Sequence, residues 1–86
     1  MSPMEKSLFT AEYRVFCKLL REKREAAGLT QVDMAQRLDE TQSYVSKCER
    51  GERRLDLVQL REFCRCIGIG LGDFVRDFER RTGKKK

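Results

Sequence analysis

The strongest constraint on the fold is how closely helix-start and helix-stop signals follow one another in the middle of the chain. Thr30, with Asp33 three residues later, has the pattern of a capping box, and Thr41 is a second candidate N-cap. Gly51 can adopt the left-handed conformation that ends a helix. The spacing therefore predicts two short helices within 30–50, joined by a tight turn.

Apolar residues recur at three- and four-residue steps through the rest of the chain, which is the period of amphipathic helices. No segment shows sustained two-residue alternation, so we expect no sheet. In the central turn, Asp39 can enter the left-handed region at less cost than most residues. The predicted fold is all-α, a compact five-helix bundle. The expected limits are a flexible N-terminal lead over 1–9, the bundle over 10–81, and a basic C-terminal tail over 82–86.

The composition fits one folded, soluble domain. The chain has 86 residues, of which 40% are hydrophobic and 38% are charged. It contains no apolar run of about 18 residues, so we expect no membrane association. No apolar signal core follows the first residues, and we expect the protein to be cytoplasmic.

Charge and residue types narrow the possible functions. The net charge of +5 and the pI of about 9.3 permit an anionic partner. The chain has no histidine and no evident activated nucleophile, so we do not expect an enzyme. Cys17, Cys48 and Cys64 fall on apolar helix faces and are expected to pack as small hydrophobes. Because the paired C-x-x-C spacing of zinc sites is absent, we expect no metal and no cofactor.

Two short helices joined by a tight turn inside a helical bundle define a helix-turn-helix. The residues of this motif resemble those of the Cro and lambda-repressor-like (Xre-type) DNA-binding domains. The resemblance covers about Leu20 to Phe78, and it implies a transcriptional regulator that binds double-stranded DNA. The matching residues are Gly28-Leu29-Thr30-Gln31, Met34-Ala35, Leu38, Val45-Ser46-Lys47 and Glu49-Arg50-Gly51.

The third helix, about 41–50, has the residue types of a recognition helix. With Val45 and Cys48 turned inward, its other side carries polar residues, and Gln42 is exposed in the first turn. Glutamine can bond adenine in bidentate fashion, and lysine can donate to guanine. The run Gln42-Ser43-x-Val45-x-Lys47 resembles the recognition helix of Cro. The alternative is an ordinary solvated face. The predicted base-reading residues are Gln42, Ser43, Ser46 and Lys47.

A second set of residues is expected on the DNA backbone. Gln31 begins the second helix, where free N–H groups and the helix dipole attract a phosphate, and the resemblance implies that role for it. Arg53 and Arg54 lie in the loop that the resemblance places along the sugar-phosphate chain. Tyr44 is left open between DNA contact and packing on the domain surface. The full backbone set is Gln31, Thr41, Tyr44, Arg50, Arg53 and Arg54.

The resemblance also implies a structural ion pair between Arg24 and Glu49, partly buried between the first and third helices. Two residues depart from the pattern of the family. Asp39 replaces a glycine that often follows the second helix, so the turn is expected to be slightly strained. Cys48 occupies a position often held by a larger residue, which predicts a third helix that is less tightly seated.

We expect a repressor-like homodimer on a pseudo-palindromic operator, with two recognition helices about 34 Å apart. The candidate dimer interface is Phe74, Val75 and Phe78 of the last helix, which exceed the apolar content that one short terminal helix needs. The alternative is a helix-turn-helix protein-interaction module, such as a toxin-binding antitoxin, in which DNA binding is secondary or lost. No small-molecule ligand is evident.

Overall fold

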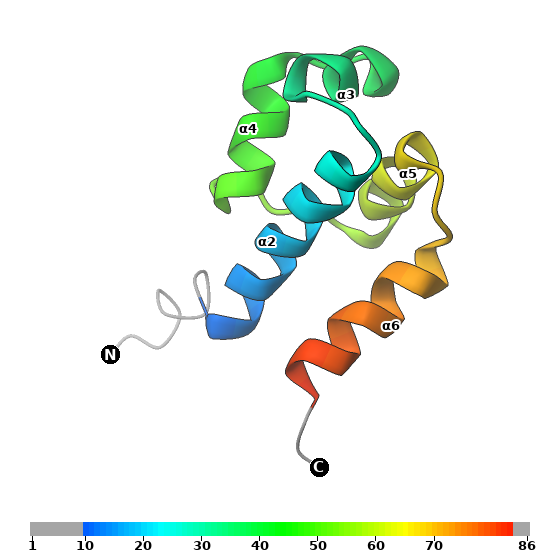
Figure 1. Ribbon diagram of the computed structural model, residues 1–86. Helices are drawn as coiled ribbons and strands as arrows, with labels where there is room; N and C mark the ends of the chain where they lie inside the picture. The colour runs from blue at the N-terminus through cyan, green and yellow to red at the C-terminus, as the bar shows by residue number, and fades with distance from the viewer. Residues whose placement is uncertain (1–9, 84–86) are drawn as a thin grey trace.

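The computed structural model describes residues 10–83, which form five helices and no strand (Figure 1). The predicted all-α bundle is therefore confirmed. The lead expected over 1–9, and residues 84–86 of the expected basic tail, lie outside the described part of the chain. In residues 10–83 no helix is long and apolar enough to cross a membrane. The helices are α2 (Ala11–Ala26), α3 (Gln31–Leu38), α4 (Gln42–Arg50), α5 (Leu57–Ile67) and α6 (Leu71–Thr82).

Side-chain caps begin four of these helices. Thr10, Thr30, Thr41 and Asp56 each accept a hydrogen bond from the backbone N–H three residues further on. The two capping boxes, at α3 and α5, have both of their reciprocal hydrogen bonds. Each cap satisfies a backbone N–H that would otherwise lack a partner within the helix, and is worth about 1 kcal/mol. Short local signals therefore set where these helices begin.

The turn between α3 and α4 depends on an aspartate in a conformation that usually belongs to glycine. Asp39 has φ 60° and ψ 44°, and among residues 10–83 it is the one non-glycine residue with positive φ. Its backbone N–H donates to the carbonyl of Gln36 at 3.2 Å. The left-handed turn expected at Asp39 is present, and only three residues separate the end of α3 from the start of α4.

The helices enclose one core (Figure 1). Helix α2 packs against α4 and α6, α3 packs against α4 and α5, and α5 packs against α6. The motif helices α3 and α4 thus form one end of the molecule, and the C-terminus of α6 lies toward the other. A fully buried Leu or Phe side chain contributes roughly 1.5–3 kcal/mol. The fully buried side chains are Leu19, Leu20, Met34, Val45, Cys48, Phe63, Cys64 and Phe74.

The apolar residues of α6 require a correction. Phe74 is only 1% exposed, and its ring meets that of Phe16 edge-on at 5.8 Å between centroids. Phe78 is half-buried and contacts Phe16 in the same way at 6.3 Å. Both rings fill the contact between α2 and α6 within one chain, so the prediction of a dimer surface at Phe74 was wrong. Val75 is 40% exposed.

The cysteines that were expected on apolar faces are inside the core. Cys17, Cys48 and Cys64 are buried, and Cys48 has no exposed surface. Burial raises the pKa of Cys17 and Cys64, and it raises the pKa of Cys48 to about 11. These thiols stay protonated at neutral pH, and a protonated thiol is a poor nucleophile and metal ligand.

Gly28 and Gly72 both have room for a Cβ, so substitutions there measure the effect of backbone conformation without a steric clash. Gly28 has φ +79°, whereas Gly72 lies in the first turn of α6, and an added Cβ would meet nothing within 4 Å at either position. Gly28→Ala should lower the free energy of unfolding by about 1 kcal/mol, because alanine resists the left-handed region. Gly72→Ala should raise it by roughly 0.5–1 kcal/mol, because alanine favours the helix. Urea denaturation measures the free energy of unfolding of both variants. A change in the same direction for both would contradict the role given to the positive φ of Gly28.

Candidate nucleic-acid interface

A buried ion pair joins the first helix of the bundle to α4. Arg24 Nε donates to Glu49 Oε2 at 2.6 Å, and Arg24 Nη2 donates to Glu49 Oε1 at 3.0 Å. The side chains are only 8% and 4% exposed. The hydrogen bonds that Arg24 donates to Glu49 raise the pKa of Arg24 despite its burial. The structural pair predicted for Arg24 and Glu49 is thus confirmed, in the bidentate geometry that suits guanidinium and carboxylate.

The same arginine also holds the connection between α2 and α3. Arg24 Nη1 donates to the carbonyl oxygen of Leu29 at 2.7 Å. In return, the backbone N–H of Leu29 donates to the carbonyl of Arg24 at 3.2 Å. Arg24 therefore fixes where α3 starts as well as where α4 lies.

A chain of hydrogen bonds leads from this pair to the surface. Gln31 Nε2 donates to Glu49 Oε1 at 3.0 Å. Gln42 Nε2 then donates to Gln31 Oε1 at 2.6 Å. Sequence reasoning assigned Gln31 only to the DNA backbone and missed both bonds, because no local pattern connects residues 11 and 18 positions apart. The side chain of Gln42, at the start of α4, is therefore oriented by hydrogen bonds that lead to the buried Arg24–Glu49 pair.

The exposed side of α4 carries the predicted base-reading residues. Gln42, Ser43 and Lys47 are exposed, Ser46 is half-buried, and Val45 and Cys48 lie in the core as expected. The hydroxyl oxygen of Ser46 accepts a hydrogen bond from Arg50 Nη1. The acidic residue of α4, Glu49, is turned inward. The outer surface of this helix is therefore uncharged or basic.

The arginines around the end of α4 each have a partner in the chain. Arg50 is paired with Glu52, with Nε donating to Oε2 at 3.0 Å and Nη2 to Oε1 at 3.1 Å. The guanidinium of Arg53 lies 5.1 Å from the centre of the Tyr44 ring, and that of Arg54 lies 4.3 Å from the Tyr13 ring. Stacking holds these two long side chains over aromatic rings while their outer edges reach solvent.

Tyr44 and Thr41 have structural tasks as well. Tyr44 is half-buried against Phe63, with 6.4 Å between ring centroids, and burial raises its pKa. Tyr44 therefore packs on the domain surface, and its contact with DNA stays a prediction. The Thr41 hydroxyl oxygen accepts from the Tyr44 N–H at 3.1 Å, which leaves the hydroxyl proton to donate elsewhere.

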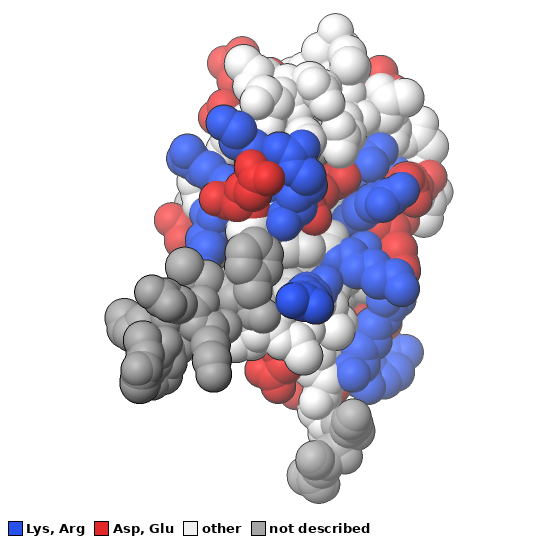
Figure 2. Space-filling model, turned by 90° about the vertical axis from the view of Figure 1, so that its left-hand side faces the viewer, with Lys and Arg blue, Asp and Glu red and all other residues white. Residues whose placement is uncertain are grey.

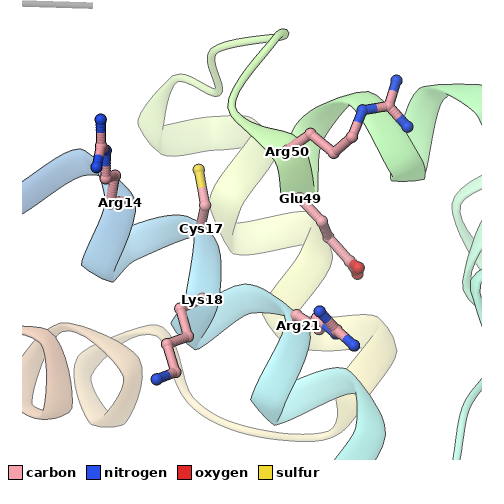
Figure 3. Close-up of a pocket in the computed structure, with 6 residues that line it drawn as sticks. All are labelled: Arg14, Cys17, Lys18, Arg21, Glu49 and Arg50. Atoms are coloured by element: carbon pink, nitrogen blue, oxygen red, sulfur yellow. The ribbon is translucent and has the colours of Figure 1, made fainter. Parts of the chain in front are cut away.

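A groove of about 600 Å³ lies between α2 and the C-terminal half of α4 (Figure 3). Sequence reasoning singled out Arg50 but not the basic residues of α2, although Arg14, Lys18 and Arg21 recur at four- and three-residue steps. Figure 2 shows Lys and Arg spread over the side of the molecule that carries α4, with uncharged side chains gathered at the end formed by α3 and α4. The groove is lined by Arg14, Cys17, Lys18, Arg21, Glu49 and Arg50.

Comparison with known proteins agrees with this geometry. The helix-turn-helix family model HTH_3 matches residues 20–74. The control protein C.MunI of a Mycoplasma species is 32% identical over 63 residues, which cover 73% of this chain and 85% of that protein. An XRE-family like protein from Pseudomonas syringae pv. tomato has a similar structure, with a TM-score of 0.80, 42% identity, and coverage of 94% of this chain and 99% of that one.

A further structure shares the fold at lower identity. The clp gene regulator ClgR from Corynebacterium glutamicum has a TM-score of 0.75 and 20% identity, with 86% of this chain and 79% of that chain covered. A capped helix pair with a basic and uncharged outer face defines a helix-turn-helix DNA-binding domain. The chain belongs to the Xre-type helix-turn-helix family of DNA-binding transcriptional regulators.

The buried pair should matter more to stability than the exposed lysine beside it. Glu49→Ala leaves the Arg24 charge buried without its partner, which should cost on the order of 3–5 kcal/mol. Lys47→Ala removes an exposed side chain and should change the free energy of unfolding by less than about 0.5 kcal/mol. Urea denaturation of the two variants makes the comparison. Equal midpoints would show that the pair does not hold the helices together.

Proposed function

We propose that the protein is a repressor-like regulator that reads operator DNA through the major groove with α4, as a homodimer on a pseudo-palindromic site. The observation that carries the proposal is the position of Gln42. It stands exposed in the first turn of α4, and Gln31 connects it to the buried Arg24–Glu49 pair. A recognition helix meets base edges with its N-terminal residues, where this oriented side chain lies.

The remaining hydrogen-bonding groups of Gln42 match one base. Its amide has two N–H donors and one carbonyl oxygen, and the bond to Gln31 uses one donor. The second N–H and the oxygen are left, and adenine presents one acceptor, N7, and one donor, N6–H, in the major groove. Because Gln31 holds the amide, little side-chain freedom is lost when the base pair is contacted. We assign Gln42 to adenine on this ground.

The other base-reading candidates differ in what they can reach. Lys47 lies on the next turn of α4, is exposed, and can donate to O6 and N7 of guanine. Ser43 is exposed and can donate or accept. The hydroxyl oxygen of Ser46 already accepts from Arg50, so its own proton is the group that it can offer to a base. We therefore rank Gln42 and Lys47 above the two serines as determinants of sequence preference.

The proposed phosphate contacts lie at the two sides of α4. The N-terminus of α3, with Gln31 as its first residue, directs backbone N–H groups outward, as anion sites at helix ends do. Beyond the other end of α4, Arg53 and Arg54 are held over tyrosine rings with their outer edges accessible. Such contacts fix the register of a protein on the duplex and carry no sequence information directly. Thr41, Tyr44 and Arg50 complete the proposed set.

The candidate dimer surface is the exposed start of α5. Leu57 and Val58, neighbours in the first turn of α5, are 65% and 60% exposed. They follow the Arg53–Arg54 loop, so a contact between two copies at this turn would set the distance between the two α4 helices. We place the dimer contact there, with Val75 as a secondary candidate. A protein-interaction module is not favoured, because the outer face of α4 is uncharged or basic.

Base reading by Gln42 and Lys47 can be tested on a selected operator and its single-base variants. Either Gln42→Ala or Lys47→Ala should reduce discrimination at one base pair by about 1–3 kcal/mol, because a bidentate or charged contact is lost. Gln36→Ala, which removes an exposed amide from α3, is the matched control and should preserve the preference. Equal weakening on every sequence would mean that Gln42 and Lys47 touch only the DNA backbone.

The dimer surface can be tested without DNA. Leu57→Glu should raise the dimer dissociation constant at least about tenfold, because a charge replaces an apolar contact. Val32→Glu, at a 52% exposed position of α3, is the matched control and should not weaken the dimer. Sedimentation equilibrium measures both. A wild-type protein that stays monomeric at tens of micromolar would contradict the homodimer.

A further inference from the structure

We propose that the face of α2 formed by Arg14, Lys18 and Arg21 is an additional contact for DNA phosphates, outside the major-groove surface of α4. This basic strip would extend the DNA footprint along the sugar-phosphate backbone. The inference rests on the proposed DNA-binding function, since it names a further part of the same interface.

The strip is continuous with the recognition helix. Its three residues line the groove between α2 and α4, together with Arg50 and Glu49 of α4 (Figure 3). Arg50 is bonded to Ser46, one turn back toward the base-reading half of α4. A duplex seated on α4 therefore passes close to the rim of this groove.

The strip also lies between the two groups of proposed phosphate contacts, which are the N-terminus of α3 and the loop with Arg53 and Arg54. At one end, Arg21 lies one turn before Arg24, which is joined through Glu49 to Gln31. At the other end, Arg14 follows Tyr13, whose ring carries the guanidinium of Arg54 at 4.3 Å. The cations of α2 thus occupy the side of the molecule between the start of α3 and the loop after α4.

The charge of the strip is largely uncompensated. Within residues 10–83, Arg14 and Lys18 are exposed and form no ion pair, while Arg21 shares its charge with Glu25 at 3.2 Å. The carboxylate in the groove, Glu49, is already neutralised by Arg24. The groove therefore presents net positive charge to solvent.

The arrangement suits an extended polyanion better than a small anion. Positions 14, 18 and 21 span about 10 Å of helix axis. The side chains of Arg14, Lys18 and Arg21 leave α2 in different directions and do not converge on one point (Figure 3). One strand of a duplex carries a phosphate about every 3.4 Å along its axis. Separate cations along a helix can meet successive phosphates, whereas a single small anion needs donors that converge.

The test uses the salt dependence of binding to a random-sequence duplex, with the full chain. The variant Arg14→Gln with Lys18→Gln removes the two unpaired cations and keeps helix-forming side chains. The matched control, Arg61→Gln with Arg76→Gln, removes the same charge from exposed positions on α5 and α6. Circular dichroism melts verify that both fold, and Arg14→Lys with Lys18→Arg should restore wild-type binding.

The salt slope is the steepness with which the logarithm of the binding constant falls against the logarithm of the salt concentration. Loss of two phosphate contacts should lower this slope by about 1.8, since each contact contributes about 0.9. A tenfold rise in salt should then cost the wild type about 60-fold more affinity than the variant. The control should keep a slope near that of the wild type. If the variant keeps it too, the strip does not contact DNA phosphates and the inference is wrong, while DNA binding stands. If wild-type binding shows no dependence on salt, the proposed function itself fails.

Discussion

The Arg24–Glu49 pair is the interaction on which the rest of the interface depends. Removing two charges from water is costly, and a buried pair is tolerated when hydrogen bonds satisfy both groups. Here Glu49 accepts from Arg24 twice and from Gln31 once, while Arg24 also holds the carbonyl of Leu29. One ion pair therefore sets the position of α4, the start of α3 and, through Gln31, the orientation of Gln42.

In the proposed complex, the reading of sequence and the strength of binding come from different parts of the surface. The end of the molecule formed by α3 and α4 is mostly uncharged, and the cations lie beside it (Figure 2). In the proposed complex, Gln42 and Lys47 discriminate bases by the direction of their hydrogen bonds, whereas the cations that contact phosphates add affinity that is independent of sequence and weakened by salt. A rigid connection to the core adds selectivity because a misplaced amide cannot readjust to a wrong base.

Features governed by neighbours in sequence could be predicted, and those governed by packing could not. Caps such as Thr30 and Thr41, and the left-handed turn at Asp39, follow from a few adjacent residues. The Arg24–Glu49 pair was implied by family resemblance. Phe74 was misplaced because a helical period shows which face is apolar and not which surface covers it. The bond from Gln31 to Glu49 needed the crossing of α3 and α4, which no local pattern encodes.

Base reading by a pair of α4 helices can be tested by selecting binding sites from a randomised duplex library with the wild-type protein. We expect enrichment of a pseudo-palindrome whose two half-sites are about 10 base pairs apart, because two α4 helices would enter the major groove one turn from each other. Bound sequences without any shared motif would contradict it. Such a result would mean that the protein binds only the phosphate backbone and that Gln42 does not read a base.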